Sequence, residues 1–454
     1  MTLFSNSPTR LLSAVAVLFF LGNAPSASAQ QAAPEPPEAP QGIGAGQQVL
    51  TLESVLEQAQ SQNETWAITE ARIDQARAVR RQAWAALLPS LSANASVTRN
   101  GDTISFGGSE VQRQYNWGVS GRASIAIFDG TRYPLLSRSG KLLEASEALA
   151  KWQRSALKFE VTQSFYLLAA TQARVAIAER TVALRQAQLE RAEALLDAKL
   201  GVKLDTELAR TQLLQAQQDL LEAQSLLENA ADALGVLLVV EPQVELRTGL
   251  RETDLEADTA RPPSQVEAIS LEKRGDLRAA QLQIEALELN KSSVWASFLP
   301  IIELGAGANY GPSSAFSNPD GFNWSVTLSA SWLLYDGGYR YGQLDQLSAQ
   351  ITESSLEYAR ELRQAGAGLR SALRAWQTAT TSVELAKQQI SAAEQAYESA
   401  SARFENGLNT SLDVADASER LFQAEVSLNQ RIFDARTAAA EYHYLLGLMG
   451  QDQE

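Results

Sequence analysis

Residues 322–336, FNWSVTLSASWLLYD, alternate between apolar and polar side chains for longer than a typical strand of a soluble protein. Asn, Ser and Thr side chains form one face, and the opposite, wholly apolar face carries Phe322, Trp324, Val326, Leu328, Ala330, Trp332 and Leu334. At about 3.3 Å per residue, the aromatic residues near the two ends would lie roughly one bilayer core apart. This pattern is typical of an outer-membrane strand, but also of an amphipathic strand in a soluble sandwich. The rest of the chain decides between the two.

The N-terminal segment, residues 1–29, has the features of a secretory signal peptide. Arg10 precedes an apolar core from Leu11 to Leu21, and the small residues Ala27-Ser28-Ala29 form a cleavage site. The core is shorter than the ~20 residues that a transmembrane helix needs. We therefore expect the mature chain to begin near Gln30 outside the cytoplasm, and to cross a membrane, if it does, by strands.

Composition and motifs argue against several classes of function. The formal net charge of −15 disfavours nucleic acid as a partner. The absence of cysteine excludes a disulfide framework and a lipidated N-terminal cysteine. The sequence has no nucleophile elbow, phosphate-binding loop or metal-ligand cluster, and the single histidine, His443, cannot form a transition-metal site alone. We therefore expect no enzymatic activity, no cofactor and no metal.

The same order of predicted helices and strands occurs twice along the chain. In the first copy we expect a helix over 51–88, strands over 91–98 and 115–128, a long helix over 135–199 and a returning helix over 205–234. In the second we expect a helix over 265–299, strands over 302–310 and 322–336, a long helix ending before Gly407 and a returning helix over 412–446. Asn116-Trp117 and Asn323-Trp324 are 207 residues apart, and Gly201 and Gly407 are 206 apart. This regularity indicates an internal duplication.

The duplication sets the expected domain boundaries. Residues 30–48 are proline-rich, so we expect an extended or disordered tether. The first repeat covers 49–235 and the second 265–447. Between them, 236–264 form an acidic connector, and 448–454 form a C-terminal tail.

The element lengths predict the fold class, which is mainly α with a membrane β-barrel. A helix over 135–199 would span about 95–100 Å, so two shorter helices have to stack end to end beside it in a long bundle of coiled coils. Four strands per chain leave open edges that lipid does not tolerate. Several chains must therefore close the barrel. Two would give a tight barrel and three a water-filled lumen, and strand counting alone does not choose between them.

In their order and spacing, these features resemble the TolC family of outer-membrane efflux proteins. The strand ends Asp129-Gly130 and Asp336-Gly337 and the helix ends Leu234-Gly235 and Leu446-Gly447 are shared, and Arg274-Gly275-Asp276-Leu277 resembles the family's Arg-Pro-Asp-Leu. The resemblance implies a homotrimer with a twelve-stranded barrel in the outer membrane and an α-helical tunnel in the periplasm. It also implies docking to a periplasmic adaptor and an inner-membrane transporter of the RND, ABC or MFS type, in multidrug efflux or type I secretion.

The candidate site lies at the start of the last helix, where Asp413 and Asp416 are three residues apart and share one helix face. One interpretation is ordinary capping, because Thr410 and Asp413 have capping-box spacing. The other, which the resemblance supports, is that three copies form carboxylate rings at a narrow periplasmic entrance, where the acids raise one another's pKa and attract cations. Glu207 holds the matching acidic place in the first repeat.

Two neighbouring positions depart from the family pattern. The family archetype has a tyrosine where Phe404 stands and an arginine where Asn409 stands, and those residues hold the entrance shut. We therefore expect closure by other contacts, or weaker closure. The hairpin tips at Gly201 and Gly407 are the expected docking points for the transporter and adaptor.

The strands supply a further set of expectations. We expect Arg122 and Glu303 to face the barrel lumen, and the lipid or its interface to be contacted by Trp117, Trp324 and Trp332. A buried strand core would produce the same pattern.

A periplasmic adaptor protein is the alternative function, because adaptors also have long coiled-coil hairpins. An adaptor would show one hairpin flanked by small β domains, whereas this sequence has two, each preceded by a strand pair of lipid-spanning length. Met1 and Met449 are the only methionines, which argues against a methionine-based copper pathway. Drug efflux and protein secretion are not distinguished by the sequence.

Overall fold

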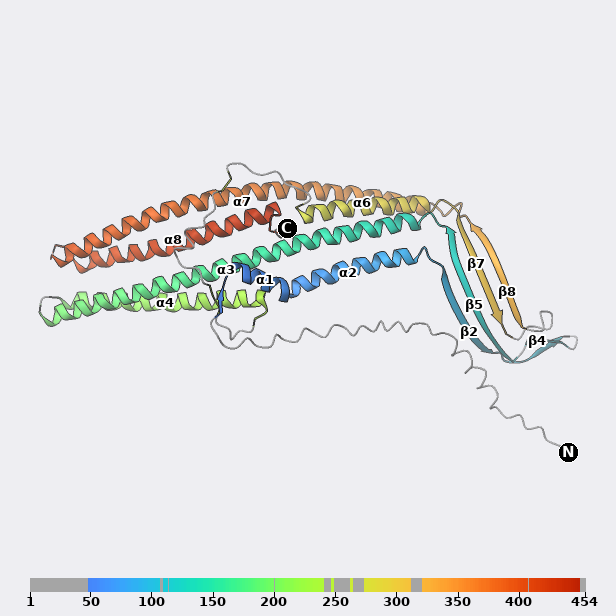
Figure 1. The fold of residues 1–454 in the computed structure, drawn as a ribbon, viewed down its shortest axis with the longest axis horizontal. Coiled ribbons are helices and arrows are strands. Elements are labelled where there is room, and N and C mark those ends of the chain that lie inside the picture. The colour runs from blue at the N-terminus through green and yellow to red at the C-terminus, as the bar shows by residue number, and fades with distance from the viewer. Residues whose placement is uncertain are drawn as a thin grey trace, which may run out of the picture. The chain divides into compact units, whose positions relative to one another are not determined.

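Most of the described chain is helical (Figure 1). The computed structural model describes residues 48–106, 109–112, 114–199, 201–240, 246–248, 262–263, 273–311, 321–406 and 408–449. These all belong to one unit, Gln47–Glu454. The expected signal peptide and tether as far as residue 47, most of the connector and tail, and Gly407 lie outside the described residues.

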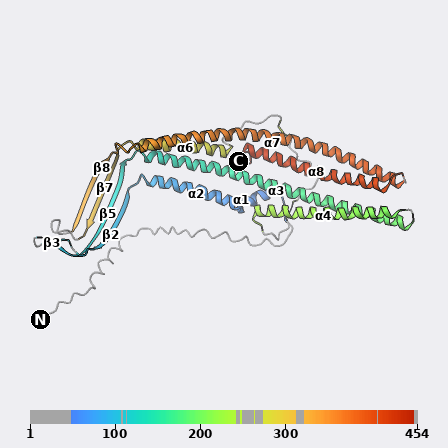
Figure 2. The same cartoon turned by 180° about the vertical axis from the view of Figure 1, so that it is seen from behind.

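Two long helices, α3 (Arg132–Asp197) and α7 (Tyr339–Glu405), organise the other helices. At 1.5 Å per residue, each is about 100 Å long. Figures 1 and 2 show α2 (Glu64–Ala85) and α4 (Lys203–Leu238) following one another along α3, and α6 (Gly275–Ala296) and α8 (Ser411–Leu446) along α7. The predicted end-to-end stacking of short helices beside a long one is confirmed.

The first helical segment is broken, and the single helix expected over residues 51–88 is wrong. α1 covers Leu52–Gln62 and α2 covers Glu64–Ala85. Between them Asn63 adopts an extended conformation, and its side-chain oxygen accepts a hydrogen bond from the Thr65 amide at 2.8 Å. Its side-chain amide donates to the Leu237 carbonyl at 2.8 Å. Asn63 therefore caps the start of α2 and connects the break between α1 and α2 to α4.

Near Asn63, side chains of α1, α3 and α4 pack together in one hydrophobic core cluster. Val55 and Phe165 pack there with Leu234 and Leu238, all at most 1% exposed. This burial explains why α4 continues to Leu238 instead of ending at Leu234 as expected.

Four strands form an antiparallel sheet in the order β2-β5-β7-β8. Their bounds are Ser90–Arg99, Tyr115–Phe128, Ile301–Tyr310 and Phe322–Ser331. The short strands β3 (Ile104–Phe106) and β4 (Ser109–Gln112) pair in the β2–β5 connection, and β1 (Gln48–Leu50) pairs with β6 (Leu246–Thr248). Within the described residues, β2 and β8 each have one partner strand, so both edges of the sheet are open.

The register gathers the apolar side chains on one face of the sheet. Trp117 is opposite Val97, and Trp324 is opposite Ala308, so these side chains share a face. On the other face Arg122 is opposite Ser92 and Gly307, and Glu303 is opposite Ser329. The predicted alternation, with one apolar and one polar face, is confirmed.

The sheet differs from expectation in two places. β8 ends at Ser331 rather than at Asp336, because its partner β7 begins at Ile301, directly after Pro300, and offers no further backbone partners. The Trp332 indole instead donates to the Phe298 carbonyl at 2.9 Å. In β5 the register shifts between Ala126 and Phe128, so Phe128 rather than Ile127 is in register with Ile302.

An Asp–Arg pair joins each strand pair to its long helix. Asp129 accepts hydrogen bonds from the Thr131 hydroxyl at 2.6 Å and from Arg132 Nε at 2.8 Å. Asp336 accepts from Arg340 Nε at 2.7 Å, and Arg340 also donates to the Leu333 carbonyl at 2.8 Å. Burial acts to raise the pKa of both carboxyls, but these hydrogen bonds outweigh it and hold each pKa below its usual value. Asp129 and Asp336 thus anchor the starts of α3 and α7.

In the part of the chain that the structure describes, no helix combines the length and the apolarity required to cross a bilayer.

Candidate functional site at the hairpin tips

Each long helix turns back into its shorter partner through a tight turn. After α3, Lys199 adopts a left-handed conformation, and the Gly201 amide donates to the Leu195 carbonyl at 2.9 Å. A Cβ at Gly201 would lie 3.2 Å from Leu195 atoms, so this turn favours glycine. After α7, the Leu408 amide donates to the Arg403 carbonyl at 2.9 Å. Gly407, the expected counterpart of Gly201, lies outside the described residues.

The two hairpins contact each other at their tips. Ser411, the first residue of α8, donates from its hydroxyl to Asp205 Oδ1 at 2.6 Å, and Asp205 lies in the first turn of α4. Beside this contact the ends of α3, α4, α7 and α8 surround a pocket of about 270 Å³. The pocket is lined by leucine side chains such as Leu195 and Leu412, and by Phe404.

Phe404, expected to depart from the family pattern, lies at the end of α7. The Arg191 guanidinium carbon lies 5.6 Å from the centre of the Phe404 ring, which is within the range of a cation–π contact. This contact joins α7 to α3 without a hydroxyl. Asn409 is half-buried and directly precedes the helix-capping residue Thr410.

Asp413 makes the capping box that the first interpretation expected. Its carboxylate accepts from the Thr410 amide at 2.9 Å and the Thr410 hydroxyl at 2.8 Å, and its own amide donates to that hydroxyl at 3.3 Å. The backbone and side-chain hydrogen bonds from Thr410 hold the pKa of Asp413 below its usual value. The expected rise in pKa concerns three copies gathered around an entrance, so it stays a prediction beside this lowering within one chain. Capping and an entrance role remain compatible, because the side chain is exposed.

The other two predicted acids are also exposed. Asp416 pairs with Arg420 at 2.8 Å, and this ion pair is open to solvent, with side-chain exposures of 60% and 72%. Glu207 lies 4.0 Å from Arg210, which also pairs with Glu193 at 3.3 Å. Ion pairs of this kind contribute little stability, so all three acids remain available to solvent and ions.

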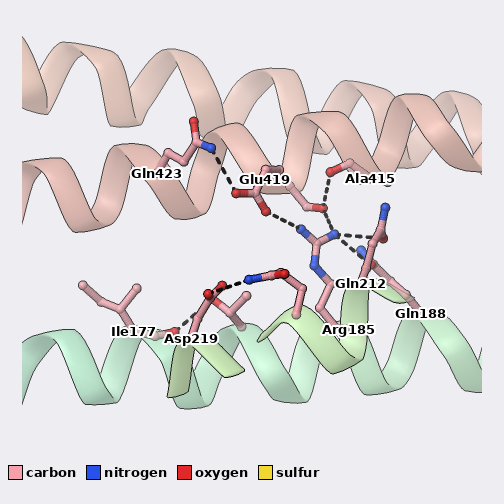
Figure 3. Close-up of polar contacts among 11 residues, drawn as sticks. Ile177, Arg185, Gln188, Gln212, Asp219, Ala415, Glu419 and Gln423 are labelled. Atoms are coloured by element: carbon pink, nitrogen blue, oxygen red, sulfur yellow. Dashed lines mark hydrogen bonds and ion pairs between the residues drawn. The ribbon is translucent and has the colours of Figure 1, made fainter. Parts of the chain in front are cut away.

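Arg185, which the sequence analysis did not single out, is the most connected polar residue near the tip (Figure 3). It lies in α3 with 3% exposure, and its Nη1 donates to the Ser418 hydroxyl and to Gln212 Oε1, the latter at 3.4 Å. Its Nη2 pairs with Glu419 at 3.2 Å. Burial lowers the pKa of Arg185 and Glu419 opposes this, but an arginine stays charged throughout the physiological range. One guanidinium thus joins α3 to α4 and α8.

The sequence does contain a pattern that marks Arg185 as unusual. Apolar residues recur every seven positions along this helix, at Val182 and Leu189 among others, and Arg185 lies three residues after one and four before the next. That is a seam position of the heptad, which is normally apolar.

Two further contacts fasten α8 to α3 at greater distance from the tip. The buried Asn429 side chain donates to the Ala170 carbonyl at 2.7 Å. Arg180 pairs with Glu425 at 3.7 Å. Together with Arg185 they form a line of polar contacts between the two halves of the chain.

Comparison with known families gives a match over residues 55–238 and 268–447 to the model named outer membrane efflux protein. The chain belongs to the outer membrane efflux protein family. Its members are channel-forming proteins, so the periplasmic adaptor alternative is wrong. The chain is accordingly an efflux protein of the outer membrane.

Individual relatives of this outer membrane efflux protein agree in length and fold. The solvent efflux pump outer membrane protein SrpC of Pseudomonas putida is 26% identical over 411 residues, which cover 87% of this chain and 85% of SrpC. The crystal structure of the outer membrane protein VceC of Vibrio cholerae superposes with a TM-score of 0.73 at 21% identity, covering 87% of this chain and 96% of VceC. The outer membrane channel CmeC of Campylobacter jejuni gives a TM-score of 0.77 at 18% identity, covering 88% and 86%.

Proposed function

We propose that three copies of this chain close a twelve-stranded barrel in the outer membrane and continue it as a helical tunnel. The observation that carries this proposal is the sheet: four strands, one continuous apolar face and two open edges. Open edges leave backbone groups unpaired, which is costly in lipid, and four strands are too few for a barrel. Edge pairing of β8 with β2 of the next copy satisfies both requirements.

The aromatic residues fit a lipid-facing surface. Trp117, Trp324 and Trp332 are 44%, 67% and 61% exposed in the single chain, which is unusual for large apolar side chains unless another phase or partner covers them. In this arrangement they contact the membrane or its interface, and Arg122 and Glu303 on the opposite face line the lumen.

The hairpin tips are the docking surface for a periplasmic adaptor and an inner-membrane transporter of the RND, ABC or MFS type. Leu204, Leu408 and Leu412 are 66%, 70% and 60% exposed around the two turns. Exposed leucines at the ends of two adjoining hairpins favour association with another protein. Gly201 lies in the first turn, and Gly407 is its expected counterpart in sequence.

The entrance to the tunnel lies beside Asp413, Asp416 and Glu207. Three copies of these exposed acids around a narrow opening would attract cations. The capping hydrogen bonds from Thr410 keep Asp413 charged to lower pH than an ordinary carboxyl, so capping supports the ring instead of competing with it.

Closure of the entrance uses contacts that replace the family's tyrosine and arginine. The Ser411–Asp205 hydrogen bond and the Arg185 network hold α8 against α3 and α4. Opening requires the α7–α8 hairpin to separate from the α3–α4 hairpin, and so requires these contacts to break.

The proposed cargo is small molecules. The relative SrpC is named as part of a solvent efflux pump, which supports efflux over protein secretion for this chain. We also propose that residues 49–235 and 265–447 are duplicated repeats joined by the connector at 236–264.

The assembly can be tested with the purified full-length protein. Extraction of washed membranes should require detergent, light scattering should give the mass of three chains, and planar bilayers should show conductance. Release by salt alone, or a monomer without conductance, would contradict the proposal.

A further inference from the structure

A cleft of about 680 Å³ lies along α3 between α2 and the start of α6. The α3 residues that line the cleft are spaced three or four apart and so lie on one face of the helix. They are Glu144, Glu147, Ala148, Lys151, Arg154, Ser155 and Lys158. Trp66 of α2 lies on one side, and Lys273 and Arg278 lie at the start of α6. The cleft is far along the chain from the tip residues and belongs to a different part of the helical bundle.

The charge of this cleft is opposite to that of the chain. Acidic residues outnumber basic ones 53 to 38 in the whole sequence, whereas five cationic side chains and two acidic ones line the cleft. Of the two acids, Glu144 is paired with Lys141 at 3.2 Å. The cleft therefore concentrates positive charge, which attracts anions.

Arg154 has hydrogen-bonding capacity that its neighbours leave unused. Its guanidinium carbon lies 4.2 Å from the centre of the Trp66 ring, and Nη2 approaches Glu70, a largely exposed side chain, at 3.5 Å. Its Nε is buried and has no hydrogen-bond acceptor among the described residues. Because Nε is enclosed by the protein, an anion in the cleft would act on Arg154 through its positive charge and not through this donor.

The start of α6 adds a second set of donors. Its N-cap residue, Arg274, provides no side-chain cap; its guanidinium instead binds Asp276 at 2.7 Å and stacks over Trp152 at 4.5 Å. The first amides of a helix lack intrahelical acceptors, and helix starts bind anions for this reason. Asp276 offsets part of this positive end.

We propose that this cleft binds a soluble anion with two or more phosphate or carboxylate groups. Lys151 and Lys158 are seven residues apart, about 10 Å along the helix, so a single small anion would not reach both. One anionic group binds between Lys151, Lys273 and the start of α6, and the other lies near Arg154 and Lys158. Because α3 and α6 come from different halves of the chain, the ligand joins them. This site does not depend on the trimer or on the entrance proposal.

The test is calorimetric titration of the detergent-solubilised full-length protein with sodium tripolyphosphate and, separately, with citrate, at constant ionic strength. Lys151→Gln with Lys158→Gln should weaken the binding at least tenfold. Arg80→Gln with Arg81→Gln removes two exposed cations of α2 that do not line the cleft, and should leave the affinity unchanged.

Tighter binding of tripolyphosphate would assign the ligand as a phosphate compound, and tighter binding of citrate as a polycarboxylate. Equal affinity of the wild type and the Lys151/Lys158 variant, or heats reproduced by sodium chloride, would overturn the proposal. A second readout is tryptophan fluorescence, because the ligand approaches Trp66. The signal should respond to the anion in the wild type and lose that response in Trp66→Phe, and an unaltered response would count against the site.

Discussion

The Ser411 hydroxyl donates a 2.6 Å hydrogen bond to the carboxylate of Asp205, a residue that holds the same place in the other half of the chain. Ser411 and Asp205 are 206 residues apart in the sequence, the same separation as Gly407 and Gly201. Equivalent positions of a duplicated sequence thus contact each other at the tip. In the proposed opening, the two hairpins separate at this contact.

Ser411→Ala should make the channel open more often. Loss of a hydrogen bond of this kind costs about 1 kcal/mol, which corresponds to a roughly fivefold change in the ratio of open to closed states. Single-channel recordings measure this ratio. Ser355→Ala is the control, because Ser355 is exposed on α7 and its hydroxyl donates to the Ile351 carbonyl at 2.7 Å; its open probability should match the wild type.

Ser418→Ala should lower the stability of the helical bundle. The Arg185 guanidinium would stay buried with one acceptor fewer, at a cost of about 1–3 kcal/mol. Thermal unfolding should show a lower Tm. The more exposed partner is Glu419, whose side chain is 48% accessible, so Glu419→Gln should have a smaller effect. A larger loss in Glu419→Gln than in Ser418→Ala would contradict the role assigned to burial.

Gly275→Ala should destabilise the protein although the new residue favours helices. A Cβ at Gly275 would lie 2.1 Å from the Ala148 carbonyl oxygen of α3, so α3 and α6 would have to separate, at about 1–3 kcal/mol or more. Gly140→Ala is the matched control on α3. No atom lies within 4 Å of a Cβ there, and alanine should stabilise the helix by up to about 1 kcal/mol. Opposite shifts in Tm are expected, and shifts of the same sign would refute the packing argument.

Cation selectivity should persist to acid pH and depend on Thr410. Hydrogen bonds from Thr410 lower the pKa of Asp413 in the folded chain, so its carboxylate stays charged to lower pH than an ordinary aspartate, and its contribution to selectivity is lost only as pH falls through that lowered pKa. Thr410→Ala removes the hydroxyl donor and raises the pKa back toward the usual one. Selectivity should then fall at higher pH than in the wild type. Thr381→Ala, an exposed position on α7, should leave the titration unchanged.

The strands and their register could be predicted because a period of two specifies which side chains share a face. The end of β8 could not, since it is set by Pro300 at the start of its partner. The break at Asn63 depends on the Leu237 carbonyl, a group 174 residues away. Long-range contacts of this kind leave no local periodicity.

At the tip, the positions of the acids could be predicted but their partners could not. Asp413 was recognised from its spacing to Thr410, and the structure shows that this spacing serves a cap. The Arg185 network was missed because its acceptors, Gln212 and Ser418, come from two other helices. The only sign of this network in the sequence is that Arg185 occupies a heptad position that is normally apolar.

The carboxylate entrance is tested most directly by the reversal potential of the channel in planar bilayers under a KCl gradient. Asp413→Ala with Asp416→Ala should lower cation selectivity, and Asp416→Asn, which leaves the Asp413 cap intact, should lower it in part. Asp434→Asn is the control, because Asp434 lies on the same helix and is likewise paired with an arginine, Arg431, at 3.4 Å. We expect a reduced reversal potential in the Asp413 and Asp416 variants and the wild-type value in Asp434→Asn. An unchanged value in all of them would contradict the carboxylate entrance.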